Sequence, residues 1–180
     1  KPNPEPVTGW EPNADGTSPY RALCEYYRAF NARDLPLLTR NWAQSEDVSI
    51  DDPMTGVRRG WRCVREVYER LLDGPALLRV ELVDYTIHEA GDLAWFVGLE
   101  RGYVRARHEE VPLAIRATLM FRRMDGRWRQ VHHHGSIDDP RLLARYQGAL
   151  QGAFATLPAA EPRNGVHLAS RAFVRERVAP

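Results

Sequence analysis

Long apolar runs, numerous cysteines and an excess of one charge are all missing from this sequence. Its two cysteines, Cys24 and Cys63, fall in segments with helical periodicity and lack the spacing of a metal knuckle, which favours free thiols over a disulfide framework. No apolar stretch approaches the ~18 residues of a membrane-spanning helix. The formal net charge is +1, and the 25 basic and 24 acidic residues are interspersed. The sequence therefore gives no reason to expect a nucleic acid or a membrane as partner.

The chain is long enough for one sizeable core, because 43% of its 180 residues are hydrophobic. Residues 1–17 are rich in proline, glycine and asparagine, which predicts an extended arm. We expect a single domain over residues 18–156, followed by a linker and tail over residues 157–180. A cytoplasmic location is expected, and the start at Lys1 also leaves room for a removed signal peptide.

The first half of the domain has mainly helical periodicity. Ser18-Pro19 is a typical N-cap followed by a proline at the first helical position, and Asp34 can cap a second helix. These signals predict helices over residues 19–32, 35–42 and 60–73, with one short strand over residues 48–51 before a turn.

The second half has strand periodicity. Strands are predicted over residues 78–88 and 93–105, and the segment 115–137 forms two more, joined at the hairpin signal Asp125-Gly126. A phase change after Leu82 predicts a bulge or a strong bend. A last helix follows Pro140. The fold class is therefore α+β, with a curved, mostly antiparallel sheet wrapped around the N-terminal helices as a conical barrel with an internal pocket.

Three consecutive histidines end the second arm of the hairpin, and strand alternation separates them. His133 must face one side of the sheet while His132 and His134 face the other. We predict a type I turn with a bulge at Gly126, which places His133 and Val131 on the inner face with Leu119. Trp128 and Gln130 would then lie on the outer face. A two-residue turn would instead place Leu119 on the same side as His132.

The segments YYRAFNARDL and DGRWRQVHHHGS, together with the order of elements from Tyr20 to Ile137, resemble the SnoaL-like branch of the nuclear transport factor 2-like superfamily. Tyr26 matches the oxyanion-hole tyrosine of ketosteroid isomerases, and Asp52 matches their general-base aspartate. The third member of that set would fall near Leu119, where the sequence is apolar, so steroid isomerisation is not expected. The end of the chain also resembles the association domain of calcium/calmodulin-dependent kinase II, which implies a non-enzymatic alternative.

We take Asp52, Tyr26 and His133 as the candidate catalytic residues. Asp52 would be a general base whose basicity an apolar cavity raises, Tyr26 an oxyanion donor, and His133 an acid or an orienting group. Each has a purely structural alternative. Asp52 can simply cap the turn before Pro53, Tyr26 can be an amphipathic core residue, and His133 can be a hydrogen-bonded core histidine.

The expected partner is a small hydrophobic molecule in a pocket lined by Trp42, Trp61, Leu119, Phe121 and Val131. A homodimer through the outer sheet face is also expected, because a monomer surface would not favour Trp128 there. The histidine pair His132 and His134 offers a metal site only with an added carboxylate, so no metal is expected. The sequence has no glycine-rich phosphate loop, and no cofactor is expected.

The sequence thus predicts a cofactor-independent enzyme that moves protons on a small, apolar, oxygenated molecule, as an isomerase, dehydratase or cyclase does. The alternative is a non-catalytic module of the same fold that binds a small ligand or assembles with other copies.

Overall fold

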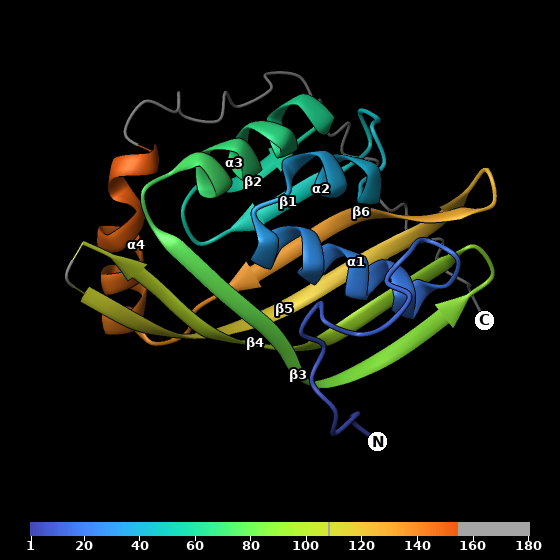
Figure 1. Cartoon of the computed structure of the whole chain (residues 1–180), viewed down its shortest axis with the longest axis horizontal. Helices are drawn as coiled ribbons and strands as arrows, with labels where there is room; N and C mark the ends of the chain where they lie inside the picture. The colour runs from blue at the N-terminus through green and yellow to red at the C-terminus, as the bar shows by residue number, and fades with distance from the viewer. Residues whose placement is uncertain (108, 155–180) are drawn as a thin grey trace, which may run out of the picture.

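A single curved sheet of six strands organises the protein in the computed structural model, which describes residues 1–107 and 109–154 (Figure 1). The strands follow the spatial order β2-β1-β6-β5-β4-β3. All neighbouring strands are antiparallel except β1 and β6, which are parallel. Their bounds are β1 (Ser49–Asp52), β2 (Gly56–Arg59), β3 (Leu77–Ala90), β4 (Leu93–Ala106), β5 (Glu109–Met124) and β6 (Arg127–Ser136).

Four helices accompany the sheet in the described part of the chain, and three of them lie over one face of it (Figure 1). They are α1 (Pro19–Ala32), α2 (Leu35–Asn41), α3 (Trp61–Asp73) and α4 (Pro140–Phe154). The predicted caps are confirmed: the side chain of Ser18 accepts from the Arg21 amide, and that of Asp34 accepts from the Leu37 amide. The α+β class predicted from the periodicity is therefore correct.

Strand β3 bends where the sequence pattern changes phase. Its pairing with β4 shifts between Val83 and Thr86, and Asp84 has a φ of 49°. Opposite the bend, a Cβ on Gly98 would lie 2.6 Å from the Cβ of Tyr85. The bulge thus brings two strand backbones close together and curves the sheet around the helices.

Strand β2 was not predicted from the sequence. It pairs with β1 through a turn that begins at Asp52, and Gly56 takes a φ of 64° there. Its four residues are almost entirely exposed, so the segment lacks the apolar alternation that marks a strand.

The N-terminal arm pairs with the edge strand β3. The amide of Asn3 donates to the Tyr85 carbonyl, and Val7 and Leu82 exchange two backbone hydrogen bonds. Val7 is fully buried. The arm therefore covers backbone groups that an edge strand would otherwise expose. The predicted tail over residues 157–180 lies outside the described residues.

The register of the β5–β6 hairpin differs from the predicted one. Met124 pairs with Arg127, and both Asp125 (φ 50°) and Gly126 (φ 74°) are left-handed, as in a two-residue type I′ turn. The bulge lies farther along, at Val131, because Met120 pairs with His132 while Phe121 pairs with Gln130.

This displaced bulge changes which side chains point inward. Trp128 and Gln130 are buried on the inner face, so their predicted outer placement is wrong. Val131 takes up the extra residue and is only partly buried. Beyond the bulge the phase reverses, and His133 pairs with Leu119 and faces inward.

Within residues 1–107 and 109–154, no helix combines the length and the apolar character that crossing a bilayer requires.

The type I′ turn gives a direct test of the hairpin geometry. A Cβ on Gly126 would meet no atom within 4 Å, so the cost of Gly126→Ala is purely the left-handed backbone. We expect a loss of about 1–2 kcal/mol in the free energy of unfolding, measured by chemical denaturation. Gly148→Ala is the matched control, because it is equally open but helical, and it should stabilise by about 0.5–1 kcal/mol. Equal effects of the two substitutions would contradict the turn assignment.

Candidate functional site

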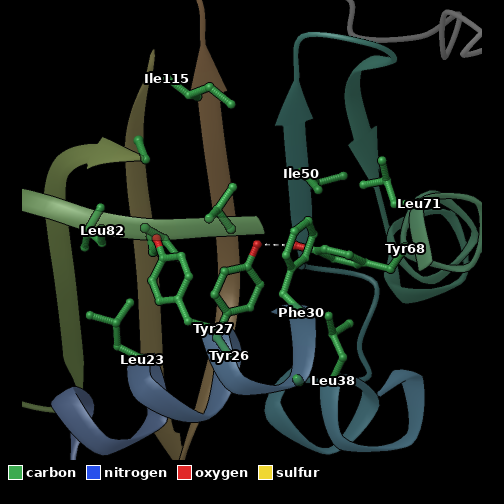
Figure 2. Close-up of a cluster of buried hydrophobic side chains, with 14 of the residues drawn as sticks. Leu23, Tyr26, Tyr27, Phe30, Leu38, Ile50, Tyr68, Leu71, Leu82 and Ile115 are labelled. Atoms are coloured by element: carbon green, nitrogen blue, oxygen red, sulfur yellow. Dashed lines mark hydrogen bonds between the residues drawn. The ribbon is translucent and has the colours of Figure 1, made fainter. Parts of the chain in front are cut away.

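A cavity of about 50 Å³ lies between α1, α3, β1 and the concave face of the sheet. Apolar side chains such as Ile50, Leu71 and Ile115 form much of its wall (Figure 2). A volume of this size holds a water molecule or a few heavy atoms, whereas pockets for drug-sized ligands reach ~300–1,000 Å³. The cavity as it stands therefore admits only a small group.

Polar groups from several elements converge on this cavity. They are Tyr26 on α1, Asp51 and Asp52 on β1, Tyr68 on α3, Glu100 on β4, His133 on β6 and Tyr146 on α4. Gln147 next to Tyr146 donates to the Pro53 carbonyl at 2.8 Å, which holds α4 against the β1–β2 turn.

His133 is hydrogen-bonded to a pair of tyrosines. The hydroxyl oxygen of Tyr26 lies 3.0 Å from His133 Nδ1, and the Tyr68 hydroxyl donates to that of Tyr26 at 3.3 Å. Figure 2 shows the hydroxyl ends of Tyr26 and Tyr68 pointing toward one another from different helices. Because Tyr68 supplies a proton to Tyr26, the Tyr26 hydroxyl is free to donate its own to Nδ1.

The other ring nitrogen of His133 faces the carboxylate of Glu100. Nε2 lies 3.4 Å from Glu100 Oε1, and the Tyr27 hydroxyl donates to the same oxygen at 2.9 Å. A hydrogen on Nε2 is the favourable tautomer, because a bare lone pair there would face a carboxylate oxygen. The contact lacks hydrogen-bond geometry, and within the described residues Nε2 is a buried atom with no hydrogen-bond partner.

Burial keeps the surrounding tyrosines protonated. It raises the pKa of Tyr26, Tyr27 and Tyr68 well above the ordinary value for a phenol, and the nearby Glu100 carboxylate raises each further. Protonated phenols are hydrogen-bond donors, so the site presents donors around one carboxylate.

Asp52 reaches the cavity rim, but its carboxylate is occupied. Oδ1 accepts from the amides of Met54 at 2.8 Å and Thr55 at 3.0 Å, and Oδ2 accepts from the Thr55 hydroxyl. This is the turn-capping role that aspartates commonly take. The three candidate catalytic residues thus share one cavity, although Asp52 has the least free hydrogen-bonding capacity of the three.

The predicted pocket lining differs from the residues that surround this cavity. None of Trp42, Trp61, Leu119, Phe121 and Val131 lines the cavity. Trp42 is fully buried against Trp61, with ring centroids 6.4 Å apart. Leu119 and Phe121 are fully buried in the solid core, because the cavity lies nearer the other end of β5, at Leu113 and Ile115.

Glu100 and Tyr68 were missed as site residues. Glu100 shares the inward phase of β4 with Ala94, Phe96 and Val104, and it is only 4% exposed. A charged residue in an otherwise apolar phase was the available signal. Tyr68 lies on the buried side of α3 with Val64 and Leu71, and helical spacing alone could not show that its hydroxyl meets Tyr26.

The two other histidines of the triplet lie on the outer face of the sheet. His132 Nδ1 is 2.8 Å from the Ser49 hydroxyl, and His134 Nδ1 is 3.2 Å from Asp51 Oδ2. In the part of the chain that the structure describes, no group of three or more His, Cys, Asp or Glu side chains is arranged to hold a metal ion.

A family comparison decides the classification. The model of the SnoaL-like domain matches residues 21–140, which is two-thirds of the chain. The chain belongs to the SnoaL-like family. No protein of curated function matches this SnoaL-like chain.

Solved structures support the same fold. A protein from Thiobacillus denitrificans, provisionally assigned as a calcium/calmodulin-dependent protein kinase type II association domain, is 27% identical with a TM-score of 0.58, over 72% of this SnoaL-like chain and 100% of that one. A nuclear transport factor 2-like protein from Streptomyces avermitilis, provisionally assigned as a dehydratase, is 24% identical with a TM-score of 0.59, over 64% and 89%. A ketosteroid isomerase-like protein from Erwinia carotovora atroseptica is 21% identical with a TM-score of 0.55, over 67% and 94%.

His132 gives this SnoaL-like domain a pH-dependent stability. Burial lowers the pKa of His132, and the neighbouring His133 and His134 lower it further. The unfolded chain, with a histidine pKa of ~6.5, therefore binds the proton more readily than the folded one. The contribution of neutral His132 to the free energy of unfolding is fully present above about pH 6.5. It is lost as the pH falls toward the pKa of His132 in the folded protein.

Replacing His132 with glutamine removes this titration and keeps a polar partner for Ser49. We expect the free energy of unfolding of His132→Gln to fall less between neutral pH and about pH 5 than that of the wild type. Denaturant unfolding at several pH values measures it, with His88→Gln, at an exposed strand position, as control. If the free energy of unfolding of His132→Gln falls with pH as steeply as that of the wild type, other groups cause the loss of stability in acid.

Proposed function

We propose that this protein is a cofactor-independent enzyme that transfers protons on a small, oxygenated, largely apolar molecule. The observation that carries the proposal is the buried His133 Nε2, which has no hydrogen-bond partner and lies beside the Glu100 carboxylate at the cavity. Buried polar groups in native proteins are rarely left unpaired, so an unpaired one at a cavity is suited to bind a ligand atom.

Glu100 is a better candidate for the general base than Asp52. Its contacts with Tyr27 and His133 both use Oε1, which leaves Oε2 available to a bound molecule. Asp52 has both oxygens engaged by its own turn.

The remaining polar groups suit the charge that would develop on the substrate. A proton taken by Glu100 from a carbon next to a carbonyl leaves an enolate, whose oxygen needs hydrogen-bond donors. His133 Nε2–H is an unpaired donor at the cavity, and Tyr26, which accepts from Tyr68, holds the ring through Nδ1. Where a double bond is conjugated with the enolate, return of the same proton from Glu100 to the far end of that double bond completes an isomerisation. Where the β-carbon carries a hydroxyl, that group takes the proton from Glu100 and leaves as water, which completes a dehydration.

The alternative is a binding or assembly module, and the similarity to the protein assigned as a kinase association domain favours it. The predicted homodimer through the outer sheet face remains a proposal, but it no longer rests on Trp128, which is buried. The exposed apolar side chain of Val97 now supports it, because Val97 lies on the outer face in one row with Thr118 and His134. Sedimentation of the wild-type protein decides whether a dimer forms.

Deuterium exchange next to the carbonyl of small ketones tests the enzymatic proposal. Proton NMR in D₂O follows the loss of the signal, with acetone and butanone as probes, because the cavity of about 50 Å³ admits only a small molecule. We expect the protein to accelerate exchange and Glu100→Gln to reduce that acceleration by about 100-fold or more, because the base is removed. Asp52→Asn should change it less than about tenfold, since Asp52 acts in the turn.

Tyr103→Phe, on the other face of β4, is the control. It should catalyse deuterium exchange of the ketones at the wild-type rate. A larger loss in Asp52→Asn than in Glu100→Gln would transfer the base role to Asp52. Saturable ketone binding with no acceleration of exchange would favour the binding module.

A further inference from the structure

A second pocket, of about 340 Å³ and open to solvent, lies where the N-terminal arm, α1, α2 and the start of β6 meet. Three arginines line it, Arg40, Arg127 and Arg129. Glu25 also lines this pocket, whereas the next residue on α1, Tyr26, lines the cavity described above. We call it the arginine pocket, and no part of the proposed catalytic chemistry uses it.

Arg127 is fixed in place by its surroundings. Its NH2 group contacts both carboxylate oxygens of Glu25, at 2.7 and 2.5 Å, and Glu25 is only 1% exposed. A Cβ on Gly16 would lie 2.5 Å from Arg127 Cγ, so the arm packs directly on the arginine stem. The tip of the β5–β6 hairpin is held beside the arm by the Trp128 amide, which donates to the Gly16 carbonyl (Figure 1).

The other two arginines are positioned but not neutralised. NH1 of Arg129 donates to the Arg40 carbonyl at 2.8 Å, near the end of α2. Within residues 1–107 and 109–154, the Arg40 guanidinium makes no hydrogen bond or ion pair, and Arg129 has no carboxylate partner. Both retain donors that can reach a molecule in the pocket.

The charges of the arginine pocket do not cancel. Glu25 offsets one of its three guanidinium groups, and Asp15, which also lines the pocket, is paired at 3.6 Å with Arg21, which does not line it. With Arg21 counted, the arginines exceed the two carboxylates by two positive charges, and the apolar walls of the pocket are Ala14 and Leu37. Guanidinium forks match the oxygens of a phosphate, which carries up to two negative charges at neutral pH.

We propose that the arginine pocket binds a dianionic phosphate group, supplied either by inorganic phosphate or by a small phosphomonoester. The buried Glu25 holds Arg127 ready for the anion, and Arg40 and Arg129 complete the set of donors. The apolar walls give an ester room for a short carbon chain beside its phosphate.

Isothermal titration of the whole chain with inorganic phosphate and with glycerol 3-phosphate, at constant ionic strength in chloride, tests this proposal. We expect saturable binding, weakened about tenfold or more in Arg40→Gln and in Arg129→Gln, because each loses charge-assisted hydrogen bonds. Tighter binding of glycerol 3-phosphate identifies an ester site, and equal or weaker binding identifies a phosphate site.

Arg123→Gln is the matched control, because Arg123 lies on the same hairpin but pairs with Asp92 outside the pocket. It should bind like the wild type. Circular dichroism of each variant separates a lost site from a lost fold, and Arg40 is exposed, so its variant should fold. Absence of saturable binding by the wild type, or equal weakening in Arg123→Gln and Arg40→Gln, would overturn the proposal.

Discussion

The buried carboxylate of Glu100 is the constraint on which the interior of this protein depends. Burying a carboxylate away from water is costly unless hydrogen-bond donors surround it. Tyr27 and His133 both approach Glu100 Oε1, each from a different element. Tyr27 extends from α1 and His133 from β6, so one charge ties the helical layer to the sheet. An apolar residue of similar size at this position would fill the core without requiring either partner, so packing alone does not explain a carboxylate here.

The position of a single bulge determines whether that arrangement exists. The two-residue turn at Asp125-Gly126 sets Trp128 and Gln130 inward, and an uninterrupted strand would have kept His132 inward as well. Val131 is the extra residue of the bulge, and beyond it the alternation of inward and outward side chains reverses. His133 therefore points inward and contacts Glu100 and Tyr26. A bulge beside a functional site commonly redirects one side chain in this way.

The sequence carried the class of the fold and most of its elements, because caps, hairpin signals and periodicity are local. It did not carry the position of the bulge, since nothing in the segment from Arg129 to His132 distinguishes a bulged residue from a regular one. The inward direction of His133 was predicted through a bulge at Gly126, which the structure places at Val131. The expected pocket walls differ from those of the cavity for a related reason. Leu119 and Phe121 do face inward, but the position of a void along the interior depends on how distant side chains fill it. Glu100 was visible as a charge in an apolar phase, and only the fold shows that His133 lies next to it.

The tautomer of His133 tests the central claim most directly. Long-range ¹H–¹⁵N correlation spectra of the imidazole groups distinguish a ring with hydrogen on Nε2 from one with hydrogen on Nδ1, and a His133→Gln variant identifies the signal among the histidines. A chain of donors running from Tyr68 through Tyr26 to Nδ1, with Glu100 facing Nε2, predicts the Nε2–H tautomer at neutral pH. A His133 ring with hydrogen on Nδ1 and a bare Nε2 would contradict it, because that ring could not donate to a substrate oxygen beside Glu100.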